Sequence, residues 1–210
     1  MKVLIFGASG DTGRLLVSSG LQHSHGITAF VRNPSKLNIH HHENLKVVKG
    51  DVSDYKKVES ALDGHDAAIS ALGAPTPLKR NPTLIKGIDN IVTAMHRQKV
   101  GRFIYQSFLG VSEYRSELGF VLDKVMPFVM RNVIKDHEAK EQTIVNSDLQ
   151  WTIVRCSLLT DGPATEKYRD GEHITSSFLL PMVSRADVAE FMIRQLTDAK
   201  YNYKKPRLMY

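Results

Sequence analysis

Three glycines recur at every third position near the start of the chain, in Gly7-Ala8-Ser9-Gly10-Asp11-Thr12-Gly13. Glycine is used where a chain bends sharply, where a phosphate approaches the backbone and where a helix packs closely on a strand. The segment follows an apolar run at residues 3–6 and precedes a helix-like run, so amides at a helix N-terminus can converge on a diphosphate. The alternative is a glycine turn of another kind of α/β protein. The predicted diphosphate site comprises Gly7, Ser9, Gly10, Asp11, Thr12 and Gly13.

The residue that follows the second predicted strand distinguishes between two related dinucleotides. This strand covers residues 27–31 and is followed by Arg32. An acidic residue at this point would accept hydrogen bonds from a free ribose 2′-hydroxyl, whereas arginine can bind a 2′-phosphate. Arg32 therefore favours NADP(H) over NAD(H) as the cofactor. The alternative is an arginine that merely ends a strand in solvent.

Two further loops follow predicted strands and should lie at the same edge of the sheet. Gly50-Asp51-Val52 follows the third strand, and Ser70-Ala71-Leu72-Gly73 follows the fourth. Doubly wound sheets bind ligands at the carboxyl ends of their strands. We therefore predict an adenine pocket in which Asp51 accepts from the adenine amino group while Val52 and Leu72 enclose the ring, with Ala71 and Gly73 beside them. The alternative is that Asp51 only caps the next helix.

A parallel sheet covered on both faces would position these loops, and strand-like and helix-like runs alternate accordingly. Strands are predicted near residues 3–6, 27–31, 45–48, 67–71, 102–106 and 151–154. Helices are expected near residues 11–19 and 132–146, and others should begin after Ser53-Asp54, after Asn81 and after Ser184. Gly101 is expected to end the helix that Asn81 begins. The predicted fold is α/β, a three-layer, doubly wound parallel sheet (Rossmann fold) in the strand order 3-2-1-4-5-6, with a small C-terminal substrate cap.

Two segments depart from this alternation. Residues 112–131 carry no tight strand signal, and Pro127 argues against an uninterrupted helix there. Residues 156–183 would form most of the small C-terminal cap. We expect residues 1–210 to form a single NAD(P)-binding domain, with 112–131 and 156–183 as candidate lid or substrate segments.

The composition of the chain excludes several other classes of protein. The single Cys156 cannot form an internal disulfide, and no apolar segment reaches the roughly 20 residues that a bilayer span needs. The net charge is 28 minus 22, or +6, with a pI of about 9.4, but lysine and arginine are scattered. This favours an anionic small ligand over nucleic acid. The start of the chain lacks a secretory signal, which favours the cytoplasm, and we expect a monomer or homodimer without membrane partners.

Two further residue types invite interpretations that the sequence does not favour. His40-His41-His42 are consecutive, so their side chains point in different directions, and no metal site is predicted there. Cys156 is expected to be a small core residue rather than a nucleophile, because nothing in the sequence predicts a lowered thiol pKa.

Eight sequence blocks in their order resemble the NmrA-like, atypical short-chain dehydrogenase/reductase family, whose members bind NAD(P)H. The blocks are GASGDTG, VRNPSKL, GDVSD, ISALGAP, YQSFLGV, LQWTIVR, LTDGPATEKYR and SRADVAEFM. Within this family the chain is most similar to the group that contains the biliverdin reductase B/flavin reductase enzyme. The resemblance covers nearly the whole chain.

The typical reductases of this superfamily use a Tyr-x-x-x-Lys motif, in which tyrosine protonates the substrate oxygen and lysine lowers the tyrosine pKa. The match here, Tyr201 with Lys205, lies in the C-terminal tail. Tyr105 and Tyr114 are each followed by leucine four positions on. Carbonyl reduction by that mechanism is therefore not expected.

The resemblance implies two candidate catalytic residues. Ser107 matches the serine that ends the fifth strand in the reductase group and orients nicotinamide or substrate. His137 matches the lysine position of the typical enzymes, and helical spacing places it with Glu141 on the face toward the sheet or the cofactor cleft. The alternatives are a small serine that satisfies a strand end and a histidine held only by a buried hydrogen bond.

One departure from the group concerns the acceptor. Leu158 stands where the reductases carry a histidine, and Cys156 stands at the usual proline position. The acceptor pocket can therefore differ, although the loop at residues 160–168 stays close to the family pattern and could cover the nicotinamide.

Hydride can pass directly from nicotinamide to an acceptor ring stacked on it, so such a reductase mainly has to orient the two rings. The predicted function is NADPH-dependent hydride transfer to a small-molecule planar acceptor, such as a flavin or quinone. The alternative is a non-catalytic NmrA-like redox sensor that binds the dinucleotide and acts through a protein partner.

Overall fold

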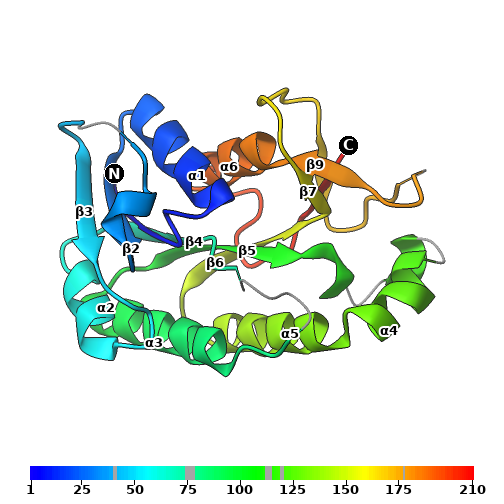
Figure 1. The fold of residues 1–210 in the computed structure, drawn as a ribbon, viewed down its shortest axis with the longest axis horizontal. Helices are drawn as coiled ribbons and strands as arrows, with labels where there is room; N and C mark the ends of the chain where they lie inside the picture. Colours follow the sequence, from blue (N-terminus) through cyan, green and yellow to red (C-terminus); the bar gives the residue numbers. More distant parts are fainter. Residues whose placement is uncertain (40–41, 74–78, 112–114, 119–120, 177) are drawn as a thin grey trace.

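Parallel pairing dominates the sheet, because most of the apolar runs predicted as strands are buried on both faces. The run at residues 45–48 differs, since it lies at the edge of the sheet and is partly exposed. This computed structural model describes residues 1–39, 42–73, 79–111, 115–118, 121–176 and 178–210. The strands of its main sheet are β1 (Lys2–Phe6), β2 (Gly26–Val31), β3 (Leu45–Lys49), β4 (Ala67–Ser70), β5 (Arg102–Phe108), β6 (Gln150–Cys156), β8 (Arg169–Gly171) and β10 (Arg207–Met209). Their order is β3-β2-β1-β4-β5-β6-β10-β8, and among these strands β8 alone runs antiparallel to its neighbour. Figure 1 shows this sheet between two layers of helices. The predicted order 3-2-1-4-5-6 is confirmed. Strands β10 and β8 extend it, and three residues are too few for a strand pattern in the sequence.

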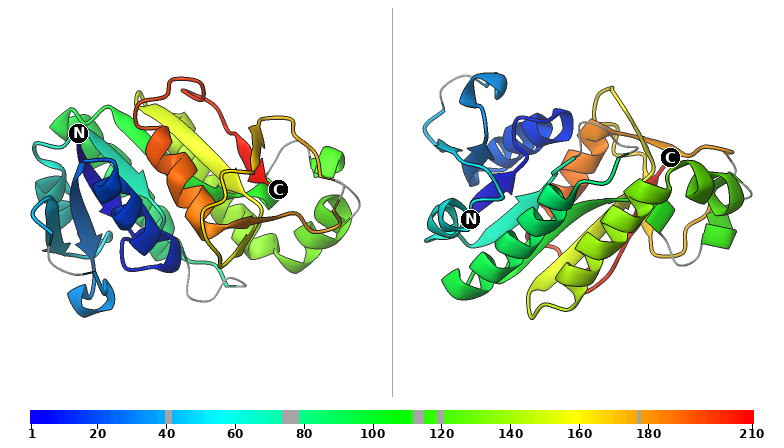
Figure 2. Two further views of the ribbon diagram at one scale, coloured as in Figure 1. Left: turned by 90° about the horizontal axis from the view of Figure 1, so that it is seen from above. Right: turned by 60° about the horizontal axis from the view of Figure 1, so that its bottom comes forward.

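Helices cover both faces of this sheet and make three layers. They are α1 (Asp11–Gln22), α2 (Tyr55–Leu62), α3 (Pro82–Gln98), α5 (Arg131–Val145) and α6 (Arg185–Arg194). Figure 2 shows α1 and α6 side by side on one face, and α3 and α5 side by side on the other. The side chains of β1 alternate between the two cores: Val3 and Ile5 belong to the core under α1 and α6, and Leu4 and Phe6 to the core under α2 and α3. The predicted doubly wound arrangement is therefore confirmed.

The helix ends show which local signals the chain uses. Asn81 Oδ1 accepts a hydrogen bond from Leu84 N at 3.1 Å, so the predicted cap of α3 is confirmed. The prediction that Gly101 ends α3 is wrong. The helix ends at Gln98, and Lys99 adopts the left-handed conformation at φ 58°. The amides of Lys99 and Val100 bond back to the last turn, and these bonds offset the cost of the left-handed residue.

The two candidate lid segments contain short elements that meet over one buried arginine. The described part of 112–131 forms η3 (Arg115–Leu118), η4 (Val121–Val125) and α4 (Met126–Val129), and in 156–183 β7 (Leu158–Thr160) pairs with β9 (Met182–Ser184) as a small second sheet. The Arg207 guanidinium lies 3.0 Å from Glu117 Oε2 and donates to the Ile174 carbonyl at 2.9 Å, so it links both segments. Residues 112–114, 119–120 and 177 lie outside the described residues. A lid role for either segment stays a prediction.

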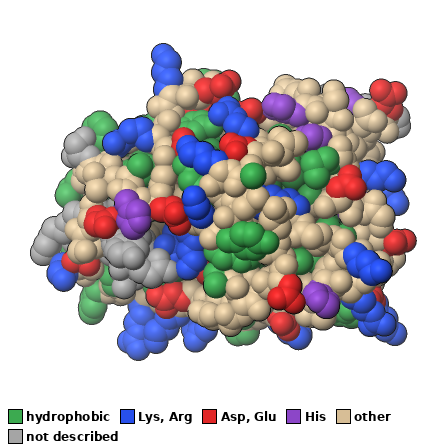
Figure 3. Space-filling model, turned by 180° about the vertical axis from the view of Figure 1, so that it is seen from behind, with side chains coloured by type: hydrophobic (Ala, Val, Ile, Leu, Met, Phe, Trp, Pro, Cys, Tyr) green, Lys and Arg blue, Asp and Glu red, His purple; other side chains and the backbone are tan. Residues whose placement is uncertain are grey.

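Surface charge and helix length would reveal a nucleic-acid surface or a membrane span. On the face shown in Figure 3, lysine and arginine side chains are interspersed with aspartate and glutamate rather than gathered in one basic patch. In the described part of the chain, no helix combines the length and the apolar character that crossing a membrane would need.

Candidate functional site

A cavity of about 410 Å³ lies at the carboxyl ends of β1, β2, β3 and β4. The predicted cofactor-binding residues that line it are Gly7, Ser9, Gly10, Arg32, Asp51, Val52, Ala71, Leu72 and Gly73. The lining residues that sequence reasoning missed are Phe30, Val31, Lys36, Gly50, Asn81, Thr83 and Leu84. The predicted residues Asp11, Thr12, Gly13 and Ser107 are not among the residues that line it. The cavity thus has the place of a ligand cleft in a doubly wound sheet.

Close approach between α1 and the end of β1 explains two of the glycines. Gly7 has a φ of +80°, and a Cβ there would lie 2.7 Å from the Ala71 carbonyl oxygen. A Cβ on Gly13 would lie only 2.0 Å from the Gly7 carbonyl oxygen. Gly13 is therefore a packing residue that lets the helix start directly against the loop.

Backbone groups at the start of α1 are the part of this loop that can bind an anion. The amides of Asp11, Thr12 and Gly13 form the first turn, where no carbonyl lies ahead of them in the helix, and Gly10 provides no side-chain cap. The Gly10 amide itself donates to the Gly7 carbonyl at 2.9 Å. Asp11, Thr12 and Gly13, rather than Gly10, therefore have the amides that are available to a diphosphate.

The acidic side chain at the start of α1 is held by a neighbouring arginine. Arg14 pairs with Asp11 Oδ1 at 2.8 Å and donates from its other terminal nitrogen to the Ser9 carbonyl at 2.9 Å. The arginine thus offsets the charge of Asp11 and braces the loop. An anion in the cavity would meet backbone amides and not an uncompensated carboxylate.

Two cations line the cavity beside the end of β2. Arg32 and Lys36 are both exposed, and neither side chain makes an ion pair or hydrogen bond with the residues that the structure describes. Lys36 lies in the 3₁₀ turn η1 (Pro34–Lys36), whose N-cap is Asn33. The signal for Lys36 was present in the sequence as a second cation four residues after Arg32. The side chain of Asn33 accepts from Ser35 N and thereby begins the turn that brings Lys36 back to the cavity.

Asp51 lines the cavity next to these cations. Its Oδ1 accepts from Ser53 N at 2.9 Å and from Ser53 Oγ at 2.7 Å. These hydrogen bonds, with smaller contributions from the charges of Arg32 and Lys57, lower the pKa of Asp51. The alternative that Asp51 caps the next helix is wrong, because the N-cap of α2 is Asp54. Whether Asp51 meets an adenine stays a prediction.

Ser107 is buried near the end of β5, with 4% of its surface exposed. The register sets Phe6 of β1 opposite Ser70 of β4, and Ser70 opposite Tyr105 of β5. Ser107 lies two residues beyond that line. It therefore belongs to the same edge of the sheet as the cavity, on the side toward β6.

His137 reaches Ser107 from α5. Its Nδ1 lies 3.3 Å from Ser107 Oγ and 3.3 Å from the Tyr105 hydroxyl oxygen. Burial and then the charge of Lys140 lower the pKa of His137 to about 3, so the imidazole is neutral at physiological pH. Burial, with the nearby Glu141 carboxylate, raises the pKa of Tyr105 well above its usual value. The structure thus brings together the two candidate catalytic residues, and their contact with a cofactor stays a prediction.

Glu141 completes this group from the next turn of α5. Ser107 Oγ donates to Glu141 Oε1 at 2.5 Å, and Arg155 Nη2 donates to Glu141 Oε2 at 2.7 Å. The side chains of Glu141 and Arg155 are each 4% exposed, and Lys205 Nζ lies 3.8 Å from the same Oε2. The predicted direction of Glu141 toward the sheet is confirmed. Sequence reasoning missed Arg155, whose signal was a single charge at the end of an otherwise apolar strand.

One buried carboxylate joins this group to the cavity. Asp136 of α5 lies 2.7 Å from Arg80 Nε and accepts from the Asn81 amide at 2.5 Å. Asn81 lines the cavity and caps α3. The helix that carries His137 is therefore fastened to the cavity wall.

The Tyr-x-x-x-Lys match in the tail lies outside this arrangement. The Tyr201 hydroxyl donates to Asp170, and the ring packs in the core under α6. Lys205 instead lies near Glu141. Cys156 is buried at 2% exposure, its pKa is raised by burial, and it packs in the core as predicted.

Among the described residues no group of three or more His, Cys, Asp or Glu side chains is arranged to hold a metal ion. His40 and His41 lie outside the described residues, and His42 Nδ1 accepts from the Asn44 amide at 3.1 Å.

Curated relatives share the sequence over part or most of the chain. The 3β-hydroxysteroid dehydrogenase/Δ5→4-isomerase of Mycobacterium tuberculosis is 33% identical over 117 residues, which are 50% of this chain and 31% of the relative. The photosystem II assembly factor Ycf39 of Cyanophora paradoxa is 25% identical over 210 residues, which are 96% of this chain and 61% of the relative. The chain thus spans less than two thirds of either protein.

Solved structures share the fold over the whole chain at low sequence identity. An oxidoreductase from Lactococcus lactis has a TM-score of 0.83 at 21% identity, with 100% of this chain and 90% of that chain covered. A short-chain dehydrogenase/reductase from Veillonella parvula, in complex with NADP, has 0.78 at 21%, with 100% and 94% covered. The anaerobilin reductase ChuY from Escherichia coli O157:H7 has 0.75 at 21%, with 100% and 97% covered.

The family follows from a match that spans most of the chain. The model of the NAD(P)H-binding family matches residues 7–199, from the first glycine of the loop to a point shortly after the end of α6. The matched stretch includes every cavity residue and the group around Ser107. The chain belongs to the NAD(P)H-binding family.

Proposed function

We propose that the protein is an NADPH-dependent reductase that acts on a small planar acceptor such as a flavin or quinone. One observation carries the proposal: a cavity with a glycine loop and two cations, Arg32 and Lys36, shares a sheet edge with the Ser107 and His137 pair. The first part suits a phosphorylated dinucleotide, and the second suits the orientation of two rings.

The residues of the cavity fit NADPH better than NADH. The first-turn amides of α1 can hold the diphosphate, and Arg32 with Lys36 can hold a 2′-phosphate, because both lack a protein partner among the described residues. The structural neighbour from Veillonella parvula binds NADP, which is consistent with this choice. NADPH bound in this way supplies the hydride.

The acceptor is proposed to be planar because the described site has groups that can orient a ring but no side chain suited to protonate a substrate. His137 is neutral, and the pKa of Tyr105 is raised, so neither side chain is suited to protonate a substrate oxygen at neutral pH. The protein would therefore mainly orient rings and exclude water. ChuY, a neighbour by fold, reduces anaerobilin, and a linear tetrapyrrole is another planar acceptor.

Cofactor choice can be tested at Arg32 and Lys36. Arg32→Asp should raise the dissociation constant of NADPH about tenfold to a hundredfold, because a charge-assisted bond to the phosphate is replaced by repulsion, with a much smaller change for NADH. Lys36→Ala should act in the same direction but less strongly. Titration of protein fluorescence with both cofactors measures these changes. Lys46→Ala, on the exposed edge of β3 away from the cavity, is the control, and unchanged NADPH affinity in Arg32→Asp would refute the phosphate role.

Catalysis can be tested with a panel of acceptors. Steady NADPH oxidation, followed by its absorbance after addition of FMN, FAD, a quinone or biliverdin, would support a reductase. Tight binding of both oxidised and reduced cofactor without turnover on any acceptor would support the sensor instead. That result would contradict the proposed reaction while leaving the cofactor site intact.

A further inference from the structure

We propose that Glu141 is a positioning residue that fixes the hydroxyl direction of Ser107, beside a His137 whose tautomer Tyr105 fixes. The inference rests on the proposed function, since it concerns the site where the rings would be oriented. The contacts among four side chains determine where their hydrogens lie, and the inference follows from those positions. The four are Tyr105, Ser107, His137 and Glu141.

The hydrogen of Ser107 is committed to Glu141. The two oxygens lie 2.5 Å apart, a separation that needs a hydrogen between them. Arg155 approaches the same carboxyl group with two nitrogens, at 2.7 Å and 3.3 Å, which keeps it a carboxylate without a hydrogen of its own. Ser107 therefore donates to Glu141 and cannot donate to anything else.

The remaining contacts then determine which nitrogen of His137 carries the hydrogen. Nδ1 faces the hydroxyls of Ser107 and Tyr105, each at 3.3 Å. Tyr105 is fully buried, and among the described residues His137 is the sole hydrogen-bond partner of its hydroxyl. If Nδ1 carried the hydrogen, the Tyr105 hydrogen would have no acceptor, which is costly in a buried position. Tyr105 therefore donates to Nδ1, and the hydrogen of the imidazole is on Nε2.

This arrangement leaves one acceptor and one donor for a ligand. Ser107 Oγ keeps a lone pair, and His137 Nε2–H has no hydrogen-bond partner among the described residues. A hydroxyl oxygen that accepts and an imidazole N–H that donates are the two kinds of group that bind a carboxamide, which has both N–H and C=O. The group would thus orient an amide-bearing ring rather than transfer a proton.

A double-mutant cycle tests whether Glu141 acts through Ser107. Glu141→Gln should lower kcat about tenfold with less than about a threefold change in KM for NADPH, whereas in the Ser107→Ala background it should change kcat less than about twofold. An equal loss in both backgrounds would mean that Glu141 only supports the fold. The melting temperature of each variant is measured alongside, because Glu141→Gln removes a counter-charge of Arg155.

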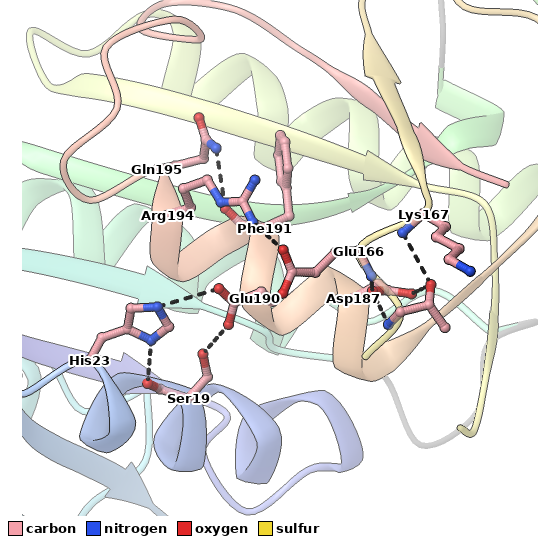
Figure 4. A network of polar contacts seen from close by, with 10 residues as sticks. Ser19, His23, Glu166, Lys167, Asp187, Glu190, Phe191, Arg194 and Gln195 are labelled. Atoms are coloured by element: carbon pink, nitrogen blue, oxygen red, sulfur yellow. Dashed lines mark hydrogen bonds and ion pairs between the residues drawn. The ribbon is translucent and has the colours of Figure 1, made fainter. Parts of the chain in front are cut away.

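A matched control lies on the opposite face of the sheet. Glu190 of α6 accepts from Ser19 Oγ at 2.9 Å and lies 3.4 Å from His23 Nε2, so it also joins a serine and a histidine (Figure 4). Glu190→Gln should leave kcat unchanged. A fall like that of Glu141→Gln would show that loss of any such carboxylate lowers activity, and would overturn the inference.

The tautomer can be read without activity. Nitrogen NMR of uniformly ¹⁵N-labelled wild-type protein, with His137 assigned by the loss of its signals in His137→Gln, should show a protonated Nε2 and an unprotonated Nδ1. Tyr105→Phe should move the imidazole hydrogen toward Nδ1, because the Ser107 oxygen then faces that nitrogen only as an acceptor. Glu141→Gln in the Tyr105→Phe background should return the hydrogen toward Nε2, because Ser107 is then free to donate to Nδ1. A protonated Nδ1 in the wild type would overturn the inference even if the protein proved to be a reductase. If no acceptor were reduced, the proposed function would fail and the NMR result would still decide the role of Glu141.

Discussion

The glycines of the loop matter because the absence of a side chain allows close approach of backbone segments. A side chain at Gly13 would overlap the Gly7 carbonyl oxygen, and one at Gly7 would overlap the Ala71 carbonyl oxygen while forcing a left-handed backbone. These close contacts pack the start of α1 against the end of β1, and the end of β1 against the loop after β4. The same closeness sets the first amides of α1 beside the cavity, so the residues that pack here are also those predicted to bind an anion.

Gly13→Ala should therefore weaken both the fold and cofactor binding. The added methyl lies 2.0 Å from a backbone oxygen, so α1 has to move, and we expect a loss of about 1–3 kcal/mol in the free energy of unfolding. NADPH affinity should fall about tenfold, because the first-turn amides shift with the helix. Urea unfolding and cofactor titration measure the two effects. Gly101→Ala, whose methyl would meet nothing within 4 Å, is the control, and equal behaviour of the two variants would contradict this account.

At the scale of elements, the start of α6 shows how a helix end can fasten a loop. Ser184 Oγ accepts from the Asp187 amide at 3.0 Å, which is one half of the predicted capping box. The Asp187 carboxylate does not return to the Ser184 amide. It accepts instead from the amides of Thr165, at 2.7 Å, and Glu166, at 2.8 Å, the latter labelled in Figure 4. It also accepts from the Tyr210 hydroxyl at 2.6 Å. The loop at residues 160–168 is thereby held on α6.

Asp187→Asn should destabilise the protein by about 2 kcal/mol, because an amide has one acceptor oxygen where the buried carboxylate uses two. Burial alone would raise the pKa of Asp187, but the bonds from Tyr210, Glu166 and Thr165 outweigh it and lower the pKa. Its contribution is therefore present above the ordinary aspartate pKa and is lost as pH falls through the lower folded value. Urea unfolding at neutral pH measures the loss. A stability equal to that of wild type would show that the loop is held by other contacts.

At the scale of the whole molecule, the sheet edge gathers groups from segments far apart in the sequence. The cavity takes residues from the loops after β1, β2, β3 and β4, and the adjoining group takes Ser107 from β5, Arg155 from β6 and His137 with Glu141 from α5. Lys205, from the chain before β10, approaches the same carboxylate. Folding therefore buries titratable groups whose pKa values then differ between the folded and unfolded states.

The stability of the whole protein should consequently fall as the solution is acidified. Burial lowers the pKa values of His65 and His137, the latter to about 3, so His137 is neutral in the folded state while its imidazole in the unfolded chain takes up a proton near pH 6.5. From pH 7 to pH 5 His137 alone should remove up to about 2 kcal/mol. His137→Gln should therefore show a smaller loss over this interval, measured by urea unfolding at both pH values. His96→Gln, with a side chain 73% exposed, is the control, and a wild-type pH dependence in His137→Gln would contradict the burial effect.

Local chemistry determined the parts of this protein that could be predicted from the sequence. The apolar runs at residues 3–6, 27–31 and 67–71 predicted buried parallel strands, and Asn81 and Ser184 predicted helix starts, because burial and capping act within a few residues. The glycine spacing and Arg32 located the cavity at the carboxyl ends of β1 to β4 for the same reason. Gly101 failed as a helix end because bonds from the last turn allow a left-handed Lys99.

Only the tertiary structure decided which distant side chains meet. Glu141 and Arg155 are 14 residues apart in the sequence. Their pairing depends on how α5 lies across β6. Lys36 enters the cavity because η1 folds back, and Asp187 bonds a distant loop in addition to the cap residue of its own helix. A sequence pattern records the preferences of neighbouring residues, whereas the direction of a hydrogen bond at Ser107 depends on charges brought together from β5, β6 and α5.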